Sequence, residues 1–542
     1  MSGSYRVPEA VNEPVLSYAP GSAERSELKD ALRTMADQEA DIPVIIGGEE
    51  IRTGVTKPLL APHDRQQRLG VWHAADADLA RRAIASTVDA HREWASWPWE
   101  DRAAVFLRAA ELLATSWRPI LNAATMHGQS KNAFQAEIDA ACEAIDFLRF
   151  GVHFAERVFA DQPISERGVW NRMEYRPLEG FVYAVSPFNF TAIGINLAAA
   201  PAMVGCGVLW KPSMHSVLSS YYAYRLLEAA GLPPGVINFV PGDPVEITEA
   251  AMDSPHFAGL HFTGSTAVFR SLWQHAARNL DRYRSYPRLV GETGGKDFIV
   301  AHPSADRAAL RTAIARGAFE YQGQKCSAAS RVYVAASVWE DIRDDLVDEV
   351  ESLRMGNPND FRNFVNAVID RRAHDRIVGY IDRATASGEV EIVAGGSYSD
   401  DEGYFVRPTI LLTTDPSHEA MCEEIFGPVV SVYVYPDGRW EETLALVDST
   451  SPYALTGAVF ADDRRAVREA LGGLRGAAGN FYVNDKPTGA VVGQQPFGGS
   501  RASGTNDKAG SALNVLRWLS PRTIKENLAP PTAVGYPFME AE

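Results

Sequence analysis

The sequence predicts an α/β protein with two α/β domains and a β arm, and three observations support this fold class. From residue 181 onward, short apolar runs alternate with stretches mostly long enough for a helix, which is typical of parallel βαβ units. A second alternating block follows, and the two blocks meet near residues 291–296. Segments 169–176 and 515–525 read as strands that fit neither block, so we expect them to form a surface arm.

The first block follows a loose lead-in over residues 1–40 that ends in a short helix. Apolar residues at helical spacing predict a helix over 101–121, and a second long helix is expected over 133–158, carrying Glu143 and Asp146. The strands expected in this part of the chain are 44–46, 68–72, 181–185, 208–211, 236–240, 259–262 and 289–292.

The second block shows the same alternation without any internal repeat or low-complexity tract. Its expected strands are 331–335, 392–394, 409–412, 429–435, 457–460 and 481–484. A chain of 542 residues is too long for one hydrophobic core, which agrees with more than one domain.

Composition and charge exclude several classes of protein. Hydrophobic residues make up 46% and charged residues 22%, which is typical of a soluble globular protein. The formal net charge of -17 disfavours a nucleic-acid partner or an anionic membrane. No run of 18 apolar residues and no secretory or transit-peptide pattern is found, so we expect a cytoplasmic protein. The four cysteines lie far apart without CxxC spacing, which favours a reducing compartment.

Cys326 is the first candidate for chemistry. It lies in the run GQKCS, where a helical segment gives way to a strand. A thiolate can attack a carbonyl carbon if its pKa is lowered, and Lys325 beside it could contribute to that. A lone cysteine is more often a small buried hydrophobe, so the residue alone leaves both interpretations open.

Glu292 and Asn189 supply the two other groups that thiol-based aldehyde oxidation requires. Glu292 is flanked by glycines in GETGGK, where a glutamate can act as general base for water or can be a solvated turn carboxylate. This run is not a phosphate-binding P-loop, because the required first glycine and the hydroxyl residue after the lysine are missing. Asn189 follows a strand end, where its amide can stabilise an oxyanion or simply occupy a turn.

Two further motifs are compatible with a dinucleotide. Lys211 ends a predicted strand and can hold ribose hydroxyls, although such a lysine is more often solvated. The run FTGST over 262–266 precedes a predicted helix, where it can bind phosphate or serve as an ordinary helix cap. We expect no metal site, since no HExxH motif or Cys/His cluster has ligand spacing.

Taken together, these runs resemble the aldehyde dehydrogenase superfamily, and most closely the subfamily that oxidises L-glutamate γ-semialdehyde. The resemblance covers roughly residues 10–525. It rests on motifs in this order: SPFNF, LWKPS, PPGVINFVPGD, FTGS, GETGGKD, GQKCSAASR, EEIFGPV and NDKPTGAVVGQQPFGGSRASGTNDKAG. The resemblance implies NAD-dependent oxidation of the semialdehyde, the open form of Δ1-pyrroline-5-carboxylate, to L-glutamate through a cysteine thioester, in proline catabolism.

The resemblance also implies roles for individual residues. The catalytic roles fall to Cys326 as nucleophile, Glu292 as general base, and Asn189 with the Cys326 backbone N–H as oxyanion hole. The implied NAD contacts are Ser186, Lys211, Gly264, Ser265, Glu424 and Phe426. The implied substrate contacts are Ser327, the Thr488-Gly489-Ala490 loop, Phe190 and Phe497, with the two rings enclosing the aliphatic chain.

The sequence departs from the wider superfamily at two positions. Thr293 replaces the commoner Leu after the catalytic Glu. Met214 stands where many relatives carry a ribose-binding Glu, and this difference bears on whether the chain prefers NAD to NADP. The remaining alternatives are a dehydrogenase of another semialdehyde, distinguished mainly by residues 488–490 and Ser327, and a non-catalytic binding or structural protein on this fold.

The implied architecture is a Rossmann-like NAD domain, an α/β catalytic domain and an oligomerisation arm. The expected boundaries are 1–40 for the lead-in, 41–164 and 181–290 for the NAD-binding domain, 291–490 for the catalytic domain, and 165–180 with 491–542 for the arm and C-terminal segment. We expect a homo-oligomer, a dimer or higher, whose only other partner is a small-molecule substrate.

Overall fold

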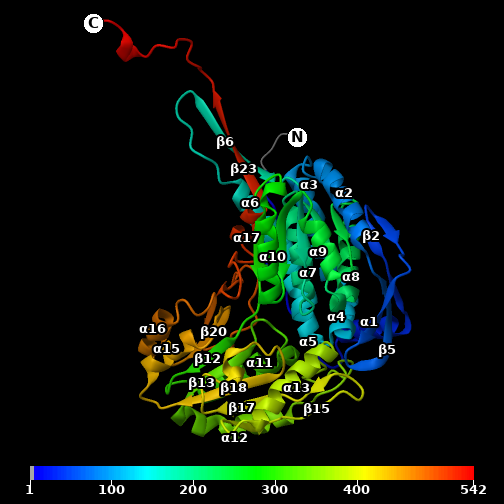
Figure 1. The fold of residues 1–542 in the computed structure, drawn as a ribbon, viewed down its shortest axis with the longest axis vertical. Helices are drawn as coiled ribbons and strands as arrows, with labels where there is room; N and C mark the ends of the chain where they lie inside the picture. The colour runs from blue at the N-terminus through cyan, green and yellow to red at the C-terminus, as the bar shows by residue number, and fades with distance from the viewer. Residues whose placement is uncertain (1–4) are drawn as a thin grey trace.

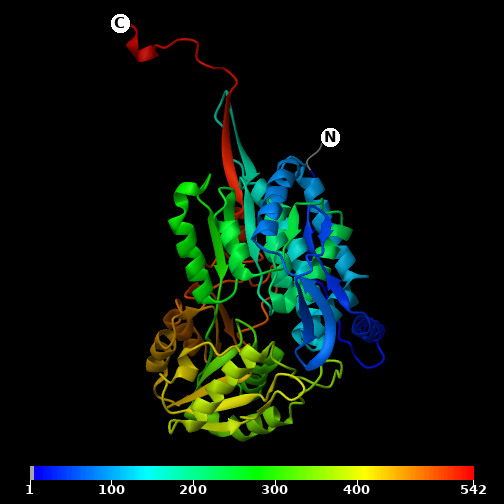
Figure 2. The ribbon, with the colours of Figure 1, turned by 45° about the vertical axis from the view of Figure 1, so that its right-hand side comes forward.

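The computed structural model describes residues 5–542, so residues 1–4 of the predicted lead-in lie outside the described part. The chain forms two α/β units, one above the other in Figure 1, with a narrow arm projecting from the upper one. Figure 2 shows the same arm standing clear of both units. Among the described residues, no helix is both long and apolar enough to cross a membrane.

The first unit is built around a seven-stranded sheet with the order β11-β10-β7-β8-β9-β2-β3. Neighbouring strands from β11 to β9 are parallel, whereas β2 and β3 extend the edge in antiparallel pairing. The strands are β2 (Val44–Ile46), β3 (Glu49–Ile51), β7 (Phe181–Val185), β8 (Gly207–Lys211), β9 (Ile237–Phe239), β10 (Phe257–Thr263) and β11 (Arg288–Glu292).

Helices cover both faces of this sheet. Helix α2 packs against β7, β8 and β9, and α7 packs against β7, β8 and β10. The helices of this unit are α1 (Ala23–Asp37), α2 (Ala77–Trp94), α3 (Trp99–Ala114), α4 (Arg118–Gln129), α5 (Ala133–Ala136), α6 (Ala144–Phe159), α7 (Thr191–Met203), α8 (Val217–Ala229), α9 (Pro244–Met252) and α10 (Thr266–Arg278). In β7, Phe181 and Tyr183 enter one apolar cluster while Val182 and Ala184 enter another, as expected for a strand buried on both faces.

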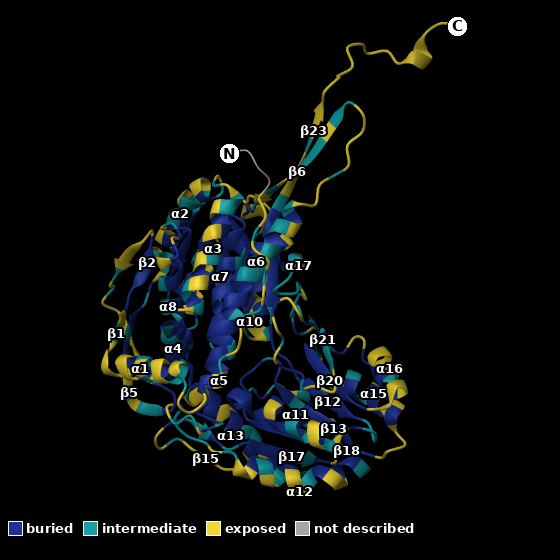
Figure 3. Cartoon of the chain, turned by 180° about the vertical axis from the view of Figure 1, so that it is seen from behind, coloured by how far each residue is buried: buried dark blue, intermediate teal, exposed yellow. Residues whose placement is uncertain are grey.

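The second unit has a sheet of the same kind, with the order β14-β17-β18-β13-β12-β20-β21 and only β14 antiparallel. Its strands are β12 (Asp297–Ala301), β13 (Ala329–Ala335), β14 (Val390–Ala394), β17 (Thr409–Thr413), β18 (Val429–Tyr435), β20 (Thr456–Phe460) and β21 (Asn480–Val483). Its main helices are α11 (Arg307–Phe319), α12 (Ala336–Ser352), α13 (Arg371–Ala386), α15 (Trp440–Ser449) and α16 (Arg464–Gly473). Figure 3 shows both sheets buried and the C-terminal tail exposed.

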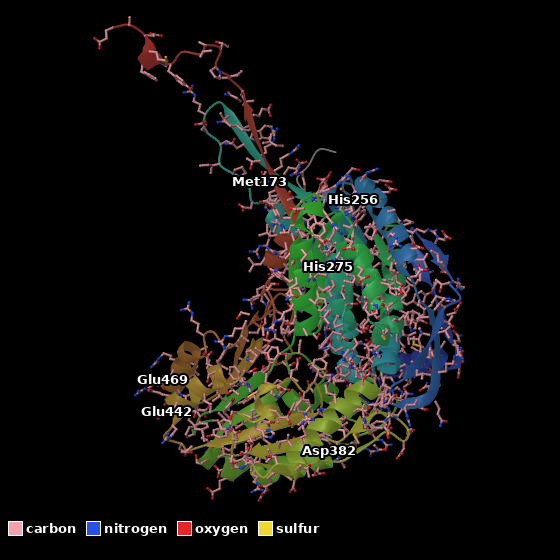
Figure 4. All side chains as sticks on the ribbon, viewed as in Figure 1. Met173, His256, His275, Asp382, Glu442 and Glu469 are labelled. Atoms are coloured by element: carbon pink, nitrogen blue, oxygen red, sulfur yellow. The ribbon has the colours of Figure 1, made fainter. Side chains whose placement is uncertain are left out.

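The remaining strands form small sheets. Strands β1 (Ala40–Ile42), β4 (Thr56–Ala61) and β5 (Asp64–His73) make a three-stranded sheet beside the first unit. The arm is an antiparallel ribbon of β6 (Val169–Pro177) and β23 (Leu519–Asn527), paired along nine residues. Figure 4 labels Met173 on the arm, where it is half-buried against Thr523 of the paired strand, and the exposed acids Asp382 and Glu442 on the outside of the second unit.

Three local predictions are wrong. The helix expected over 101–121 is broken, because α3 ends at Ala114 and α4 begins at Arg118; Pro119 in its first turn has no N–H for a continuing helix. The helix expected over 133–158 contains a π-helical stretch, Glu137–Glu143, between α5 and α6. The C-terminal strand begins only at Leu519, after the short helix α17 (Ala512–Arg517).

Strand β12 was not predicted, although it lies inside the second sheet between β13 and β20 and all five of its residues are buried. The other expected strands of both sheets are confirmed. The lead-in is also more ordered than expected, because residues 7–18 hydrogen-bond to buried side chains of the first unit.

Candidate active site

The candidate residues of the first unit stand at the carboxyl ends of its parallel strands, where ligand sites of open α/β sheets lie. Lys211 and Glu292 are the last residues of β8 and β11. Ser186 directly follows β7, and Gly264 with Ser265 directly follows β10. The Gly264 N–H donates to the Glu292 carbonyl over 3.1 Å, which joins two of these strand ends.

A cavity of about 300 Å³ collects the predicted nucleophile, base and substrate contacts from distant parts of the chain. Its lining includes Cys326, Glu292, Ser327, Phe190, Phe497, Gly489 and Ala490. The cavity therefore brings together the residues that the sequence assigns to chemistry and to the substrate, while their individual roles stay predictions.

Asn189 lies next to this cavity and is 4% exposed. Its side-chain Nδ2 donates to the Gln324 carbonyl over 3.0 Å, so the amide is fixed against the nucleophile segment two residues before Cys326. An amide NH₂ group has two protons, and this bond uses one of them. The second proton is available to a developing oxyanion.

The segment before Cys326 has a left-handed backbone at three successive residues, Tyr321 (φ 52°), Gln322 (φ 54°) and Gly323 (φ 64°). Such conformations are costly for non-glycine residues and persist only when surrounding contacts impose them. The Gln322 amide supplies those contacts, because it donates to the carbonyls of Ser130 and Ala367 and accepts from the Asn366 N–H. The nucleophile is therefore presented by a strained and firmly held loop.

The charges around Cys326 keep its thiol protonated at rest. Burial raises the pKa of Cys326 well above its ordinary value, and the nearby carboxyl of Glu292 raises it further. Burial also raises the pKa of Glu292 to about 8, against a lowering by Lys508. The charge of Asp507 also raises the pKa of Glu292, so the Glu292 carboxyl keeps its proton up to neutral pH.

Ser327 connects the nucleophile to the loop at residues 488–490. Its Oγ lies 2.8 Å from Oγ1 of Thr488, and both residues are buried. Gly489 has φ +91°, a conformation that favours glycine, and its loop borders the cavity. Hydroxyl and backbone N–H groups are the donors that bind carboxylates in proteins, and the role of Ser327 and of this loop as a carboxylate site stays a prediction.

The predicted cofactor residues lie outside the cavity lining. Buried Lys211 donates to the Pro212 carbonyl over 3.2 Å, and burial lowers its pKa to about 8. The Ser186 hydroxyl accepts from the indole N–H of Trp210, and the Ser265 hydroxyl caps α10 by accepting from the Val268 N–H. The cap expected as the alternative for Ser265 is thus present in the structure.

Glu424 and Phe426 line a separate small cleft that also includes Lys325. The Glu424 carboxylate accepts from the Gly295 N–H over 2.8 Å, and burial raises its pKa to about 7. A Cβ on Gly294 would lie 2.3 Å from Glu424 Oε2, so this close approach requires glycine. Lys325 borders both the cleft and the cavity and forms a buried ion pair with Glu320 at 3.0 Å.

Two acidic residues near the site were not predicted as functional. Glu143 lines the cavity, and burial together with the charge of Asp139 raises its pKa well above the ordinary value. Asp139 accepts from the backbone N–H groups of Thr191 and Ala192 at the start of α7 and pairs with buried Lys131 at 2.7 Å. Both acids belong to the π-helical stretch, whose extra residue per turn no helical periodicity in the sequence reveals.

Lys131 lies between two rings of the site. Its Nζ is 4.1 Å from the centroid of Phe190 and 4.4 Å from that of Tyr321, within the range of cation–π attraction. It thereby couples the segment of Asn189 to the strained segment before Cys326. Within residues 5–542, no cluster of three or more His, Cys, Asp or Glu side chains is arranged to hold a metal ion.

Comparisons with known proteins agree on one family. The model of the aldehyde dehydrogenase family matches residues 52–524. A mitochondrial delta-1-pyrroline-5-carboxylate dehydrogenase of Dictyostelium discoideum is 52% identical, covering 98% of this chain and 96% of the relative. The enzyme of the same name from Agaricus bisporus is 51% identical, with 98% of each chain covered. A crystal structure of delta-pyrroline-5-carboxylate dehydrogenase from Mycobacterium tuberculosis bound with NAD is 54% identical, covers both chains fully and superposes with a TM-score of 0.97.

Proposed function

The chain belongs to the aldehyde dehydrogenase family, and from this premise we propose that it oxidises L-glutamate γ-semialdehyde to L-glutamate with NAD, the second step of proline catabolism. The semialdehyde is the open form of Δ1-pyrroline-5-carboxylate. The observation that carries the substrate assignment is the contact between Ser327 and Thr488, because it places donors for a carboxylate in the same cavity as Cys326.

In the first step, Sγ of Cys326 gives up its proton and attacks the aldehyde carbon. A C–S bond forms, the carbonyl π bond breaks, and its electron pair moves onto oxygen. The free proton of the Asn189 amide and the Cys326 backbone N–H stabilise that oxyanion, and one such donor contributes about 3–4 kcal/mol in the transition state. Because burial raises the pKa of the thiol, its proton must pass to a base as the bond forms.

Bound NAD would supply the hydride acceptor, and the adduct carbon that loses the hydride would remain on Cys326 as a thioester. In the second step, the Glu292 carboxylate takes a proton from water, and the resulting hydroxide attacks the thioester carbon. The C–S bond breaks, glutamate leaves and the Cys326 sulfur is released. The raised pKa of Glu292 suits this task, because a general base works best when its pKa lies near the working pH.

The residues at the strand ends fit a dinucleotide. Among the described residues, the buried Lys211 ammonium has one acceptor, the Pro212 carbonyl, so two of its protons remain for ribose hydroxyls. Ser186, Gly264 and Ser265 stand at neighbouring strand ends, where backbone can approach a phosphate. Glu424 and Phe426 would contact the nicotinamide ribose from the second unit.

The substrate would lie in the cavity with its aldehyde at Cys326. Ser327 and the backbone of Gly489 and Ala490 would hold the α-carboxylate. Phe190 and Phe497 would enclose the aliphatic chain, which excludes water and limits its motion.

The test follows NADH formation with Δ1-pyrroline-5-carboxylate, succinic semialdehyde and butanal, for the wild type and for Cys326→Ala. We expect the highest kcat/KM with pyrroline-5-carboxylate and no turnover in the variant. Faster turnover of succinic semialdehyde would contradict the substrate assignment, and undiminished activity of Cys326→Ala would contradict the mechanism.

Assembly, location and domain boundaries are part of the same proposal. The ribbon of β6 and β23 carries exposed strand edges, which supports a homo-oligomer formed through the arm.

All four cysteines are unpaired, which suits a reducing compartment such as the cytoplasm, although the Dictyostelium relative is named mitochondrial. The NAD-binding part would comprise residues 41–164 and 181–290, and the catalytic part 291–490. Light scattering of the purified protein and cell fractionation test the first two points.

A further inference from the structure

Residues 12–18, which we call the N-terminal strap, run along the mouth of the cavity that holds Cys326. Asn12, Glu13 and Val15 are among the residues that line this cavity. The strap has no regular secondary structure and lies outside residues 52–524, which match the family model. The strap therefore adds residues to the cavity wall from outside the part of the chain that matches the family model.

Asn12 uses both ends of its side-chain amide. Its Nδ2 donates to Oδ2 of Asp146 in α6 and to the carbonyl of Val492, each over 2.8 Å. Its Oδ1 accepts from Nε2 of Gln494 over 2.9 Å. One side chain thus joins the helix behind the cavity to the segment that directly follows the Gly489-Ala490 loop.

The strap itself is fixed by charged groups of the first unit. Glu13 forms ion pairs with Arg118 at 2.6 Å and with Arg149 at 2.8 Å, and its side chain is 10% exposed. The Leu16 N–H and the Tyr18 hydroxyl donate to the two carboxylate oxygens of Glu137, which is buried. Because these pairs are largely removed from water, the strap is a firm support for Asn12.

The loop that Asn12 contacts needs such a support. Gly489 and Gly493 both have left-handed φ values, +91° and +83°, and glycine permits many other conformations at such positions. Side chains from other parts of the chain hold this backbone at both ends, since Thr488 contacts Ser327 and the Val492 carbonyl accepts from Asn12. Between them, the Val491 N–H donates to the side chain of Gln495.

We propose that Asn12 is a positioning residue that sets the selectivity of this enzyme for an aldehyde bearing an α-amino acid head group. It acts through the backbone of residues 489–492 and has no role at the reacting carbon. The inference rests on the proposed function, since it assigns that loop to the substrate's carboxylate.

The experiment measures steady-state kinetics of Asn12→Ala with pyrroline-5-carboxylate and with butanal, which has no head group. We expect KM for pyrroline-5-carboxylate to rise roughly tenfold, because the variant loses the hydrogen bond that holds the Val492 carbonyl beside the loop, with kcat and the butanal kinetics within about twofold. Glu9→Ala, an exposed position ahead of the strap, is the matched control and should behave as wild type. Equal losses with both aldehydes, or no change with either, would overturn the proposal.

A second variant covers the case in which Asn12→Ala does not fold. Gln494→Ala removes only the bond to Asn12 Oδ1 and is exposed, so it should fold and raise KM for pyrroline-5-carboxylate by about threefold with butanal unaffected. An unchanged KM in this variant, when Asn12→Ala is unfolded, overturns the proposal. The wild-type preference between the two aldehydes tests the proposed function separately, because the inference depends only on the ratio between variant and wild type.

Discussion

The hydroxyls of Ser327 and Thr488 lie 2.8 Å apart, although 161 positions separate the two residues in the sequence. This contact joins the loop of the nucleophile to the loop that would hold the substrate's α-carboxylate. Both side chains are buried, so under the proposed function this contact would connect the reactivity of the site to its selectivity.

Ser327→Ala should reduce selectivity without abolishing the chemistry. A hydrogen bond to a charged group contributes about 1.5–3 kcal/mol, so we expect KM for pyrroline-5-carboxylate to rise about 10- to 100-fold. Kinetics with butanal should change little, because butanal has no carboxylate. Ser352→Ala, an exposed serine at the end of α12, is the control and should resemble wild type. An equal effect of Ser327→Ala on both aldehydes would contradict the assignment.

Asn189→Ala should lower kcat and leave KM nearly unchanged. The loss of one oxyanion donor typically costs 10²–10³ in kcat, which is about 2.7–4 kcal/mol. Asn189→Asp is a useful companion, because it keeps the shape of the side chain and has no N–H to donate. Single-turnover NADH formation separates this effect from product release. A kcat within twofold of wild type would remove Asn189 from the oxyanion hole.

Activity should rise with pH through about 8, where it is half its maximum, and level off only about one pH unit higher. The pKa of Glu292 is raised to about 8, so its protonated form persists through neutral pH and the active carboxylate becomes the major form only above that value. The raised pKa of Cys326 acts in the same direction. The check is kcat, which includes thioester hydrolysis, alongside kcat/KM, which reports the attack of Cys326, from pH 6 to pH 9.5, with circular dichroism to confirm folding. Activity that has already reached its plateau by pH 5, as expected for a glutamate with an ordinary pKa, would contradict the raised pKa of Glu292.

Gly295→Ala should inactivate the enzyme. A Cβ at this position would lie 2.2 Å from the Cys326 carbonyl oxygen and 2.4 Å from Oδ2 of Asp297. The nucleophile loop would have to move, and a displacement of about 1 Å typically costs 10²-fold in rate. Gly388→Ala is the matched control, because a Cβ there meets nothing within 4 Å. Normal kinetics in Gly295→Ala would show that the loop tolerates displacement.

The strands of the fold were predictable wherever apolar runs are separated by helix-length segments, as for β7, β8 and β10. Strand β12 was missed because only four residues separate it from β11, so the sequence shows no intervening helix. The broken helix at Thr115–Trp117 was missed because apolar periodicity continues across the break.

Some residues of the candidate site could also be selected from the sequence, and others could not. Cys326, Glu292 and Asn189 were found because each lies in a distinctive local motif. Asn12 and Asp139 carry no such signal, since their importance comes from tertiary hydrogen bonds to Val492 and to the start of α7. Contacts of this kind between distant segments leave no trace in composition or spacing.

The most direct test of the central claim is mass spectrometry of the Glu292→Gln protein mixed with NAD and pyrroline-5-carboxylate. The variant lacks the base for hydrolysis but keeps the nucleophile, so the thioester should accumulate. We predict one glutamyl group on the peptide that contains Cys326, formed together with one equivalent of NADH per active site. NADH formation with Cys326 unmodified, or the acyl group on another residue, would contradict the account.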